Sequence, residues 1–362
     1  MVSRTPGRDP ANRRFVQNPA TIVPAETETI NTDALDRRIM SALQFDGRAS
    51  IRRIAQALGS SEQTVARRYR RLREAGILRV VALPDPRASR ESLFVRIRTA
   101  PGAAEPIGSA LARRPDVSWV TLAAAGTEVM CALRADDPRD RDELVLRNLP
   151  RLSQVTDVST ASLLHVFAET GLQEWQGFDA RLDAQEIAAL GARSRRDVPV
   201  RRTADEPGLT PDDDALLAPL AADGRISYAA LAAATGRNES AVARRVEALL
   251  ERGMLFVDVE VAYALIGFRA AATLWLTVAP ADIHRVGGEI ALHPEVGFVG
   301  AVSGPASLVV AVTCRDTADL YRYITERLAP ITAIRQHEVT VTVRHLKQAG
   351  TVMDGDRLPR LP

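Results

Sequence analysis

The chain has 362 residues, a formal net charge of +2 and 46% hydrophobic residues. This composition is typical of a soluble protein with two to four domains, and so small a net charge does not identify a partner. The two cysteines, Cys131 and Cys314, lie far apart, which argues against a disulfide framework or a cysteine-rich metal site and favours a reducing cytoplasm. No apolar run approaches the roughly 20 residues that a membrane span requires.

Residues 1–30 mix Arg, Pro, Thr and Glu without periodicity. We interpret them as a disordered arm, and not as a secretory signal, because they lack an apolar core. A first helix is predicted next, because apolar residues recur at helical spacing from Leu35 to Leu43. Thr32 or Asp33 is its expected cap.

The segment from Ser50 to Leu78 is typical of two helices around a tight turn. Ser50 can cap the first helix and Gly59 can end it, while Ser61 caps the second and Gly76 ends that one. The expected buried face of the second helix consists of Val65, Tyr69 and Leu72. This pattern predicts a helix-turn-helix whose second helix reads a DNA major groove.

A βαββαβ unit follows the helix-turn-helix. Residues 77–83 are predicted to form a strand in the short hairpin of a winged helix, which completes a first domain at 31–86. Strands are then expected at 93–98, 117–123, 129–133 and 155–167, and helices at 107–112 and 140–149. This order over 91–170 predicts a ferredoxin-like domain. The free apolar face of such a sheet is expected to dimerise or to bind a ligand.

After a predicted linker at 171–208, the sequence repeats itself with an offset of 177 residues. Asp46-Gly47-Arg48 returns as Asp223-Gly224-Arg225, and Val65-Ala66-Arg67-Arg68 returns as Val242-Ala243-Arg244-Arg245. A second helix-turn-helix is therefore predicted at 209–262, a second βαββαβ domain at 266–347 and a tail at 348–362. The predicted fold class is α+β, with two winged or helix-turn-helix DNA-binding domains alternating with two ferredoxin-like βαββαβ domains.

The segment Leu35-Asp36-Arg37-Arg38-Ile39, the run Asp46-Gly47-Arg48-Ala49-Ser50 and the helix Thr64-Val65-Ala66-Arg67-Arg68 resemble the Lrp/AsnC (feast/famine) family of transcriptional regulators, in a tandem-unit form. The resemblance implies an effector and oligomerisation role for the βαββαβ domains. The family has a glycine followed three residues later by aspartate in its effector turn; here the glycines Gly126 and Gly304 are followed by Val129 and Ser307. The candidate effector residues are Ala124, Ala125, Gly126, Thr127, Glu128, Ser303, Gly304 and Pro305.

The candidate DNA contacts lie on the outer face of each second helix and near its start. In the first copy they are Ser61, Gln63, Thr64, Arg67, Arg68, Arg70 and Arg71, with Arg52 and Arg53 on the preceding helix as phosphate contacts. In the second copy they are Asn238, Ser240, Arg244 and Arg245. The window 61–76 carries a net charge of +3 and the matching window 238–253 carries none. We therefore expect the second copy to bind DNA more weakly.

The sequence thus predicts a cytoplasmic, nucleoid-associated, sequence-specific regulator that binds double-stranded DNA and a small effector, such as an amino acid or related metabolite. A homo-oligomer is expected, and no catalytic residue, metal, cofactor or membrane partner is predicted. Two alternatives stay open. One is an enzyme similar to sirohaem decarboxylases, which share this fold, and the other is an architectural DNA-binding protein without an effector.

Overall fold

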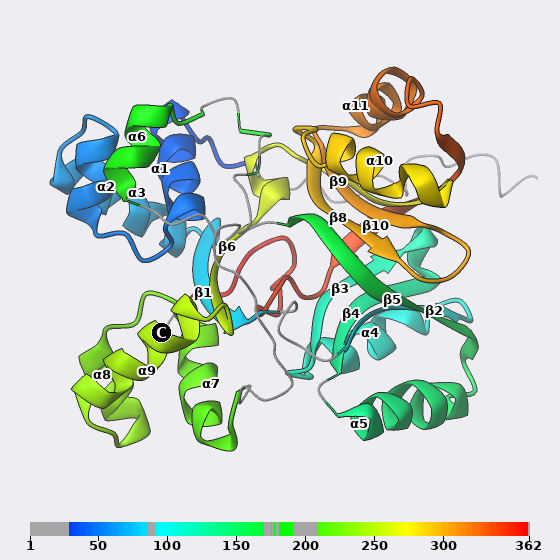
Figure 1. The fold of residues 1–362 in the computed structure, drawn as a ribbon, viewed down its shortest axis with the longest axis horizontal. Helices are drawn as coiled ribbons and strands as arrows, with labels where there is room; N and C mark the ends of the chain where they lie inside the picture. Colours follow the sequence, from blue (N-terminus) through cyan, green and yellow to red (C-terminus); the bar gives the residue numbers. More distant parts are fainter. Residues whose placement is uncertain are drawn as a thin grey trace, which may run out of the picture.

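The computed structural model describes residues 29–85, 91–135, 137–169, 175, 177–178, 181–191 and 209–360. The predicted disordered arm lies outside these residues except for its last two positions, and so does the charged part of the linker at 192–208. The fold is mixed α+β. The two helix-turn-helix units lie on one side of the molecule and the two βαββαβ units on the other (Figure 1).

The first helix-turn-helix unit follows the predicted pattern closely. It comprises α1 (Ala34–Phe45), α2 (Ile51–Ala57), α3 (Glu62–Glu74) and the strand β1 (Leu78–Pro84). Asp33 caps α1 in a capping box, because its carboxylate accepts from Asp36 N while the Asp36 carboxylate accepts from Asp33 N. Ser50 and Ser61 cap α2 and α3, as predicted.

The second unit has the same order of elements. It comprises α7 (Asp214–Ala222), α8 (Tyr228–Thr235), α9 (Glu239–Glu251) and the strand β6 (Leu255–Val261). Ser227 and Asn238 cap α8 and α9 at the positions equivalent to Ser50 and Ser61. Gly236 ends α8 in the left-handed conformation, which glycine adopts at little cost.

The prediction that residues 77–83 form the hairpin of a winged helix is wrong in its pairing. β1 is a strand, but it pairs antiparallel with β6 of the second copy, from Leu78 opposite Val261 to Pro84 opposite Leu255. The physical reason is that both strands are mostly buried, so the backbone groups of each must find hydrogen-bond partners inside the protein, and each strand finds them in the other copy. The two-stranded ribbon joins the two helix-turn-helix units within one chain.

The Asp-Gly-Arg repeat locks this pseudo-dimer. Arg48 donates through Nη1 to the carbonyl of Gly224 at 2.5 Å and through Nη2 to that of Ile226 at 3.1 Å. Arg225 donates reciprocally to the carbonyls of Gly47 at 2.5 Å and Ala49 at 2.8 Å. Each arginine therefore binds the loop that holds its own equivalent. We call these two arginines with their four acceptor carbonyls the arginine clasp.

The two βαββαβ units have the predicted element order. The first comprises β2 (Glu91–Thr99), α4 (Ala104–Ala112), β3 (Val117–Ala123), β4 (Glu128–Ala135), α5 (Pro138–Asp142) continued by a π-helix at Glu143–Asn148, and β5 (Val155–Glu169). The second comprises β7 (Ala270–Val278), α10 (Ile283–Ile290), β8 (Val296–Val302), β9 (Leu308–Cys314), α11 (Thr317–Arg322) continued by a π-helix at Tyr323–Leu328, and β10 (Ile334–His345).

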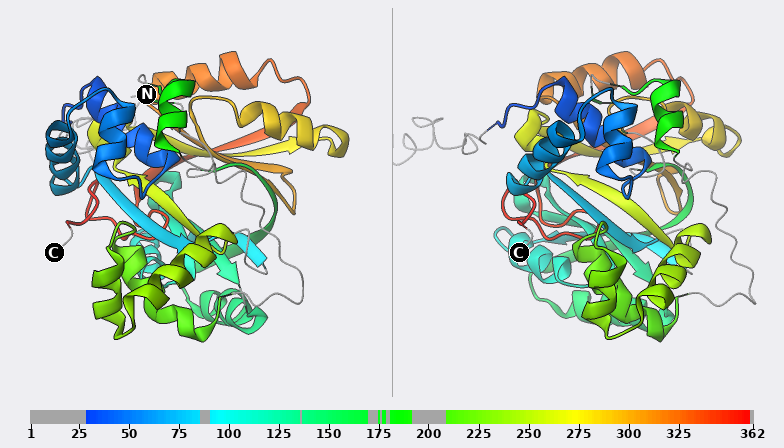
Figure 2. Two further views of the ribbon diagram at one scale, coloured as in Figure 1. Left: turned by 60° about the vertical axis from the view of Figure 1, so that its left-hand side comes forward. Right: turned by 90° about the vertical axis from the view of Figure 1, so that its left-hand side faces the viewer.

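The two sheets close into one barrel in the strand order β10-β3-β4-β2-β5-β8-β9-β7. The junctions β5–β8 and β10–β3 join the edges of the two copies, and each copy's helices lie outside the barrel (Figures 1 and 2). The inner faces pack against one another through Phe94, Met130, Trp275, Phe298 and Val309. The free apolar face predicted for each sheet is thus covered within the chain, although much of the barrel interior is open to a cavity.

Parts of the predicted linker and tail belong to the cores. Trp175, Phe178 and Leu190 are buried in the core of the first helix-turn-helix unit, where the helix α6 (Ala184–Leu190) contacts α1 and α2. In the tail, Leu358 is buried and its N–H donates to the Gly76 carbonyl. Within the part of the chain that the structure describes, no helix is long and apolar enough to cross a membrane.

We predict that the double substitution Arg48→Ala with Arg225→Ala lowers the free energy of unfolding by about 2–4 kcal/mol, because it removes four hydrogen bonds from charged donors. Urea denaturation followed by circular dichroism measures this change. Arg335→Ala is the matched control, since Arg335 is exposed on β10. A double variant as stable as the control would show that the arginine clasp contributes nothing to stability.

Candidate nucleic-acid interface

The helix α3 presents the exposed residues Gln63, Arg67 and Arg70 on the side opposite its buried face. Within the described residues, the side chains of Arg67 and Arg70 make no hydrogen bond or ion pair. Thr64 is half-buried, and its hydroxyl accepts from the cap Ser61 at 2.8 Å. Free guanidinium groups along one exposed helix face suit contacts with phosphates and guanines.

Arg68 and Arg71, which the sequence placed among the DNA contacts, bind the first helix of their own unit. Arg68 Nη1 lies 2.6 Å from Asp33 Oδ2 and 3.1 Å from Asp36 Oδ1, and Arg71 also pairs with Asp36, whose carboxylate is buried. The hydrogen bond to Asp33 raises the pKa of Arg68, and the same bond lowers the pKa of Asp33. In this structure both arginines hold α3 against α1.

The second copy repeats this ion pair. Arg245, the equivalent of Arg68, donates from Nε and Nη2 to the buried carboxylate of Asp213, both at 2.7 Å. Burial opposes ionisation of Asp213, but hydrogen bonds from Arg245 and Thr210 outweigh it and lower the pKa of Asp213 to about 2. Arg244, the equivalent of Arg67, is exposed. The paired arginines thus divide into one that faces outward and one that anchors the helix.

The remaining predicted contacts are partly engaged inside the chain. Arg53 pairs with Asp46 at 3.2 Å and donates to the Leu190 carbonyl, whereas Arg52 is exposed and lies 3.8 Å from Glu62. In the second copy the side-chain oxygen of Asn238 accepts from Ser240 N and Ser240 Oγ, so both residues form the cap of α9. Of the two arginines, Arg52 is the more exposed.

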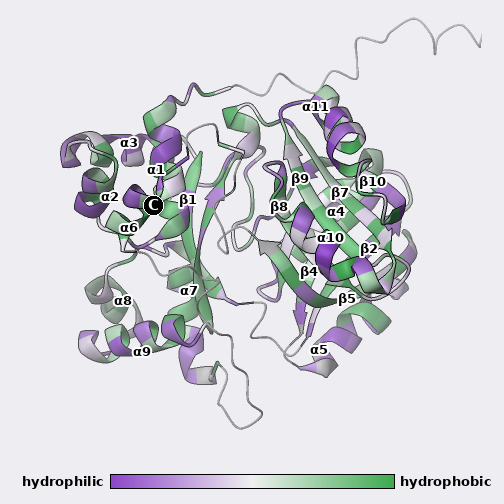
Figure 3. Ribbon diagram, turned by 45° about the horizontal axis from the view of Figure 1, so that its top comes forward, coloured by the Kyte–Doolittle hydropathy of each residue, from purple (hydrophilic) through white to green (hydrophobic). Residues whose placement is uncertain are grey.

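The two recognition helices lie in units that share one side of the molecule (Figures 1 and 2), and hydrophilic residues follow both helices (Figure 3). Their outer faces differ in charge. The exposed Arg70 of α3 corresponds to the exposed Glu247 of α9, and Gln63 corresponds to Ser240. The two helices therefore occupy equivalent positions in the two units, but their outer faces are unlike.

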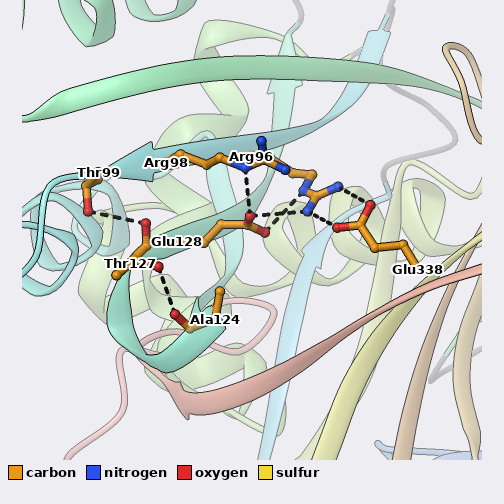
Figure 4. Close-up of polar contacts among 7 residues, drawn as sticks. All are labelled: Arg96, Arg98, Thr99, Ala124, Thr127, Glu128 and Glu338. Carbon is orange, nitrogen blue, oxygen red and sulfur yellow. Dashed lines mark hydrogen bonds and ion pairs between the residues drawn. The ribbon is translucent and has the colours of Figure 1, made fainter.

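The first candidate effector turn is held by its own contacts. Thr127 Oγ1 donates to the Ala124 carbonyl at 2.8 Å, and Ala124 and Ala125 have positive φ. Glu128 is buried and accepts two hydrogen bonds from Arg96, which also binds Glu338 of the second copy (Figure 4). Burial opposes the charge of Arg96, but its hydrogen bonds to Glu338 and Glu128 raise its pKa.

These ion pairs, together with that of Arg98 to Glu128 at 3.5 Å, form a network that joins the two βαββαβ units across the barrel through Glu338. The sequence did not predict them. In the sequence, the only sign that the Glu338 side chain faces the barrel interior is its place in the alternation of polar and apolar residues along β10.

The second candidate turn is built differently. Gly304 has a φ of 103°, a conformation that favours glycine. Ser303 Oγ accepts from Ser162 N at 2.8 Å, which ties the turn to β5, and Ser307 Oγ accepts from Val278 N and donates to the Val278 carbonyl. Among the described residues, no group of three or more His, Cys, Asp or Glu side chains is arranged to hold a metal ion.

Comparison with known proteins identifies the family. The family model of the AsnC-type helix-turn-helix domain matches residues 33–73 and 209–250, and that of the Lrp/AsnC ligand binding domain matches 271–352. An HTH-type transcriptional regulator of Pyrococcus abyssi is 34% identical over 131 residues, which cover 36% of this chain and 82% of the relative. The chain belongs to the Lrp/AsnC family. It is a helix-turn-helix transcriptional regulator with a ligand-binding domain.

Other matches agree with this assignment. The regulator AldR of Mycolicibacterium smegmatis is 30% identical over 152 residues, which cover 40% of this chain and 88% of AldR. Among solved structures, the sirohaem decarboxylase NirDL matches 88% of this chain and 93% of its own, with a TM-score of 0.57 and 15% identity. At that identity NirDL shows that the regulator shares its fold, including the tandem arrangement, and nothing more.

Substitution of Asp213 is predicted to have a pH-dependent effect. The pKa of Asp213 is lowered in the folded state, so its ionised form stabilises the fold. This stabilisation is complete at pH values above the ordinary pKa of 3.8 and is lost as the pH falls through about 2. Asp213→Asn should therefore cost about 1–2 kcal/mol at pH 6 and little at pH 2.

Urea denaturation of the wild-type chain and the Asp213→Asn variant at pH 6, 4 and 2 measures this difference. Asp212→Asn is the matched control, since Asp212 is exposed. A difference that stays constant across the three pH values would contradict the ion-pair explanation.

Proposed function

We propose that the regulator reads DNA mainly with α3, through Arg67 and Arg70, and that α9 contributes fewer contacts through Arg244. The observation that supports this proposal is the division of each arginine pair. Arg68 and Arg245 are engaged with buried carboxylates, whereas Arg67 and Arg244 are exposed in equivalent positions. Only the first copy adds the exposed Arg70, where the second has Glu247. Ser61, Gln63, Thr64 and Arg52 complete the proposed surface of the first copy.

The asymmetry has a consequence for the operator. In a homodimer two identical helices read two identical half-sites. Here the ribbon and the arginine clasp hold the two helix-turn-helix units together within one chain. Each DNA-binding pair therefore consists of one α3 and one α9. We propose that the operator is not palindromic and consists of a strong half-site for α3 and a weaker one for α9. The regulator is further proposed to act in the cytoplasm on the nucleoid, to respond to a small-molecule effector and to associate into homo-oligomers.

We predict that Arg67→Ala lowers affinity for DNA by tenfold or more, whereas Arg244→Ala lowers it by less than threefold. The two positions are equivalent, so each variant is the matched control of the other. Fluorescence anisotropy on a labelled fragment from upstream of the regulator's own gene measures the affinities, and repeating the titration at several salt concentrations gives the number of phosphates contacted. Equal losses from the two variants would contradict the asymmetry.

A catalytic role is the second candidate, favoured by the fold shared with NirDL over most of the chain. We propose that the regulator is not an enzyme. Incubation of the purified chain with sirohaem under reducing, anaerobic conditions should release no carbon dioxide above the rate without protein. Turnover that releases carbon dioxide would overturn this proposal, whereas binding of sirohaem without turnover would not, because a binding site need not be catalytic.

A further inference from the structure

A large cavity lies where the interior of the barrel meets the DNA-binding half of the chain. Its volume is about 1240 Å³. The barrel contributes apolar walls that include Phe94, Met130 and Phe298, and the DNA-binding half contributes Leu83 of β1, Leu217 of α7 and Phe256 of β6. Drug-sized ligands occupy pockets of roughly 300–1,000 Å³, so this cavity can hold a molecule much larger than a free amino acid.

The polar groups of the lining favour an anion. The lining carries more cationic than acidic side chains: Arg79, Arg113, Arg114, Arg134 and Lys347 against Asp116 and Asp214. Arg114 pairs with Asp116, while Arg79 and Lys347 donate to backbone carbonyls, which do not neutralise their charge. In addition, His345 lines the cavity, and its buried Nδ1 has no hydrogen-bond partner among the described residues. Burial lowers the pKa of His345, which agrees with a neutral imidazole enclosed by the protein. An unpaired buried polar atom is costly unless something binds it.

The backbone at the cavity wall is also unusual. Trp119 has a φ of 52°, a left-handed conformation that bulky side chains rarely adopt, at an irregularity in the pairing of β3 with β4. The irregularity places Trp119 in the cavity lining, and its N–H donates to the carbonyl of Gln348 at 3.2 Å. Irregularities of this kind re-aim side chains beside binding sites, and an indole suits the flat face of an aromatic ligand.

From the size, the apolar walls and the charge of this cavity, we propose that it is the effector site of the regulator and that its ligand is an amphipathic organic anion, with a broad apolar or aromatic body and at least one carboxylate or similar group. This location differs from the two turns at 124–128 and 303–305 that the sequence suggested. The effector role rests on the proposed DNA-binding function, but binding in the cavity does not.

The position of the cavity provides the coupling to DNA. Its wall includes Asp214, Leu217 and Ala222 of α7, and Asp213 at the start of that helix anchors α9 through Arg245. A ligand that fits the cavity in only one placement of α7 stabilises the corresponding placement of the recognition helix. Ligand binding and DNA binding then change each other's affinity by the same factor.

The test uses the full chain with two probes that share one aromatic body. The probe 8-anilino-1-naphthalenesulfonate is anionic, and N-phenyl-1-naphthylamine lacks the sulfonate. Fluorescence titration should give at least tenfold tighter binding of the anionic probe. Equal affinities would overturn the proposed ligand class, and no binding of either probe would overturn the site.

The location is tested by filling the cavity. Ala311→Phe on β9 and Ala132→Phe on β4 place a ring in the lining, whereas Ala318→Phe makes the same change at an exposed position of α11. Both cavity variants should weaken the anionic probe at least tenfold, and the control should not change it. Circular dichroism establishes which variants fold, and the two positions give independent chances of a folded variant. Unchanged binding in a folded cavity variant would overturn the location.

Coupling is measured separately. Saturating anionic probe should change the DNA affinity of the wild-type chain at least threefold and leave that of Ala311→Phe unchanged. A probe that binds the cavity without changing DNA affinity overturns the effector role alone. If the chain does not bind DNA in the absence of any probe, the proposed function fails while the cavity site stands or falls on the fluorescence result.

Discussion

The pairing of β1 with β6 determines the arrangement of the rest of the molecule. Seven residues of each strand pair in continuous register, and this ribbon lies between the two helix-turn-helix units. The arginine clasp adds reciprocal hydrogen bonds from Arg48 and Arg225 to the opposite loops. In these loops the close packing leaves no room for a side chain at Gly47 or Gly224. Because both partners belong to one chain, the association costs no translational entropy and does not depend on concentration. Two unlike helices therefore stay paired at any dilution.

Duplication also explains which interactions are kept in both copies. The bonds that maintain the pseudo-dimer and each recognition helix occur twice, as in Arg68 with Asp36 and Arg245 with Asp213. The outer residues of α3 and α9 differ. The bridge of Arg96 with Glu128 and Glu338 occurs only once among the described residues, because the positions equivalent in the strand pairing to Arg96 and Glu128 hold Trp275 and Ser307. The contacts that hold each recognition helix are thus symmetric, whereas the outer helix faces and the Arg96 bridge between the two halves of the barrel are not.

Much of the architecture could be predicted from the sequence because its signals are local. Caps at Ser50 and Ser61, helical periodicity and the 177-residue repeat give the elements and their order. Sequence patterns do not reveal contacts between residues that are far apart in the chain. The local sequence of β1 is that of a strand that could equally form a hairpin with its neighbour. In the structure β1 pairs instead with β6, some 180 residues away. Likewise, Arg67 and Arg68 are adjacent identical residues, and only the position of Asp36 on α1 shows that Arg68 anchors the helix.

The same limit applies to the proposed ligand site. The resemblance to regulators with an effector turn directs attention to Gly126 and Gly304, but a tandem chain closes both sheets into one barrel and so creates an interior shared by the two copies. Residues of that interior come from strands throughout the chain, and none forms a motif. Among the described residues, the lining of the cavity includes α7 and no residue of α1. Through Asp213 and Arg245 this links the cavity to α9, the helix that we propose to bind DNA more weakly. An effector there would adjust the weaker half of the DNA contact, while α3 keeps its hold on the stronger half-site.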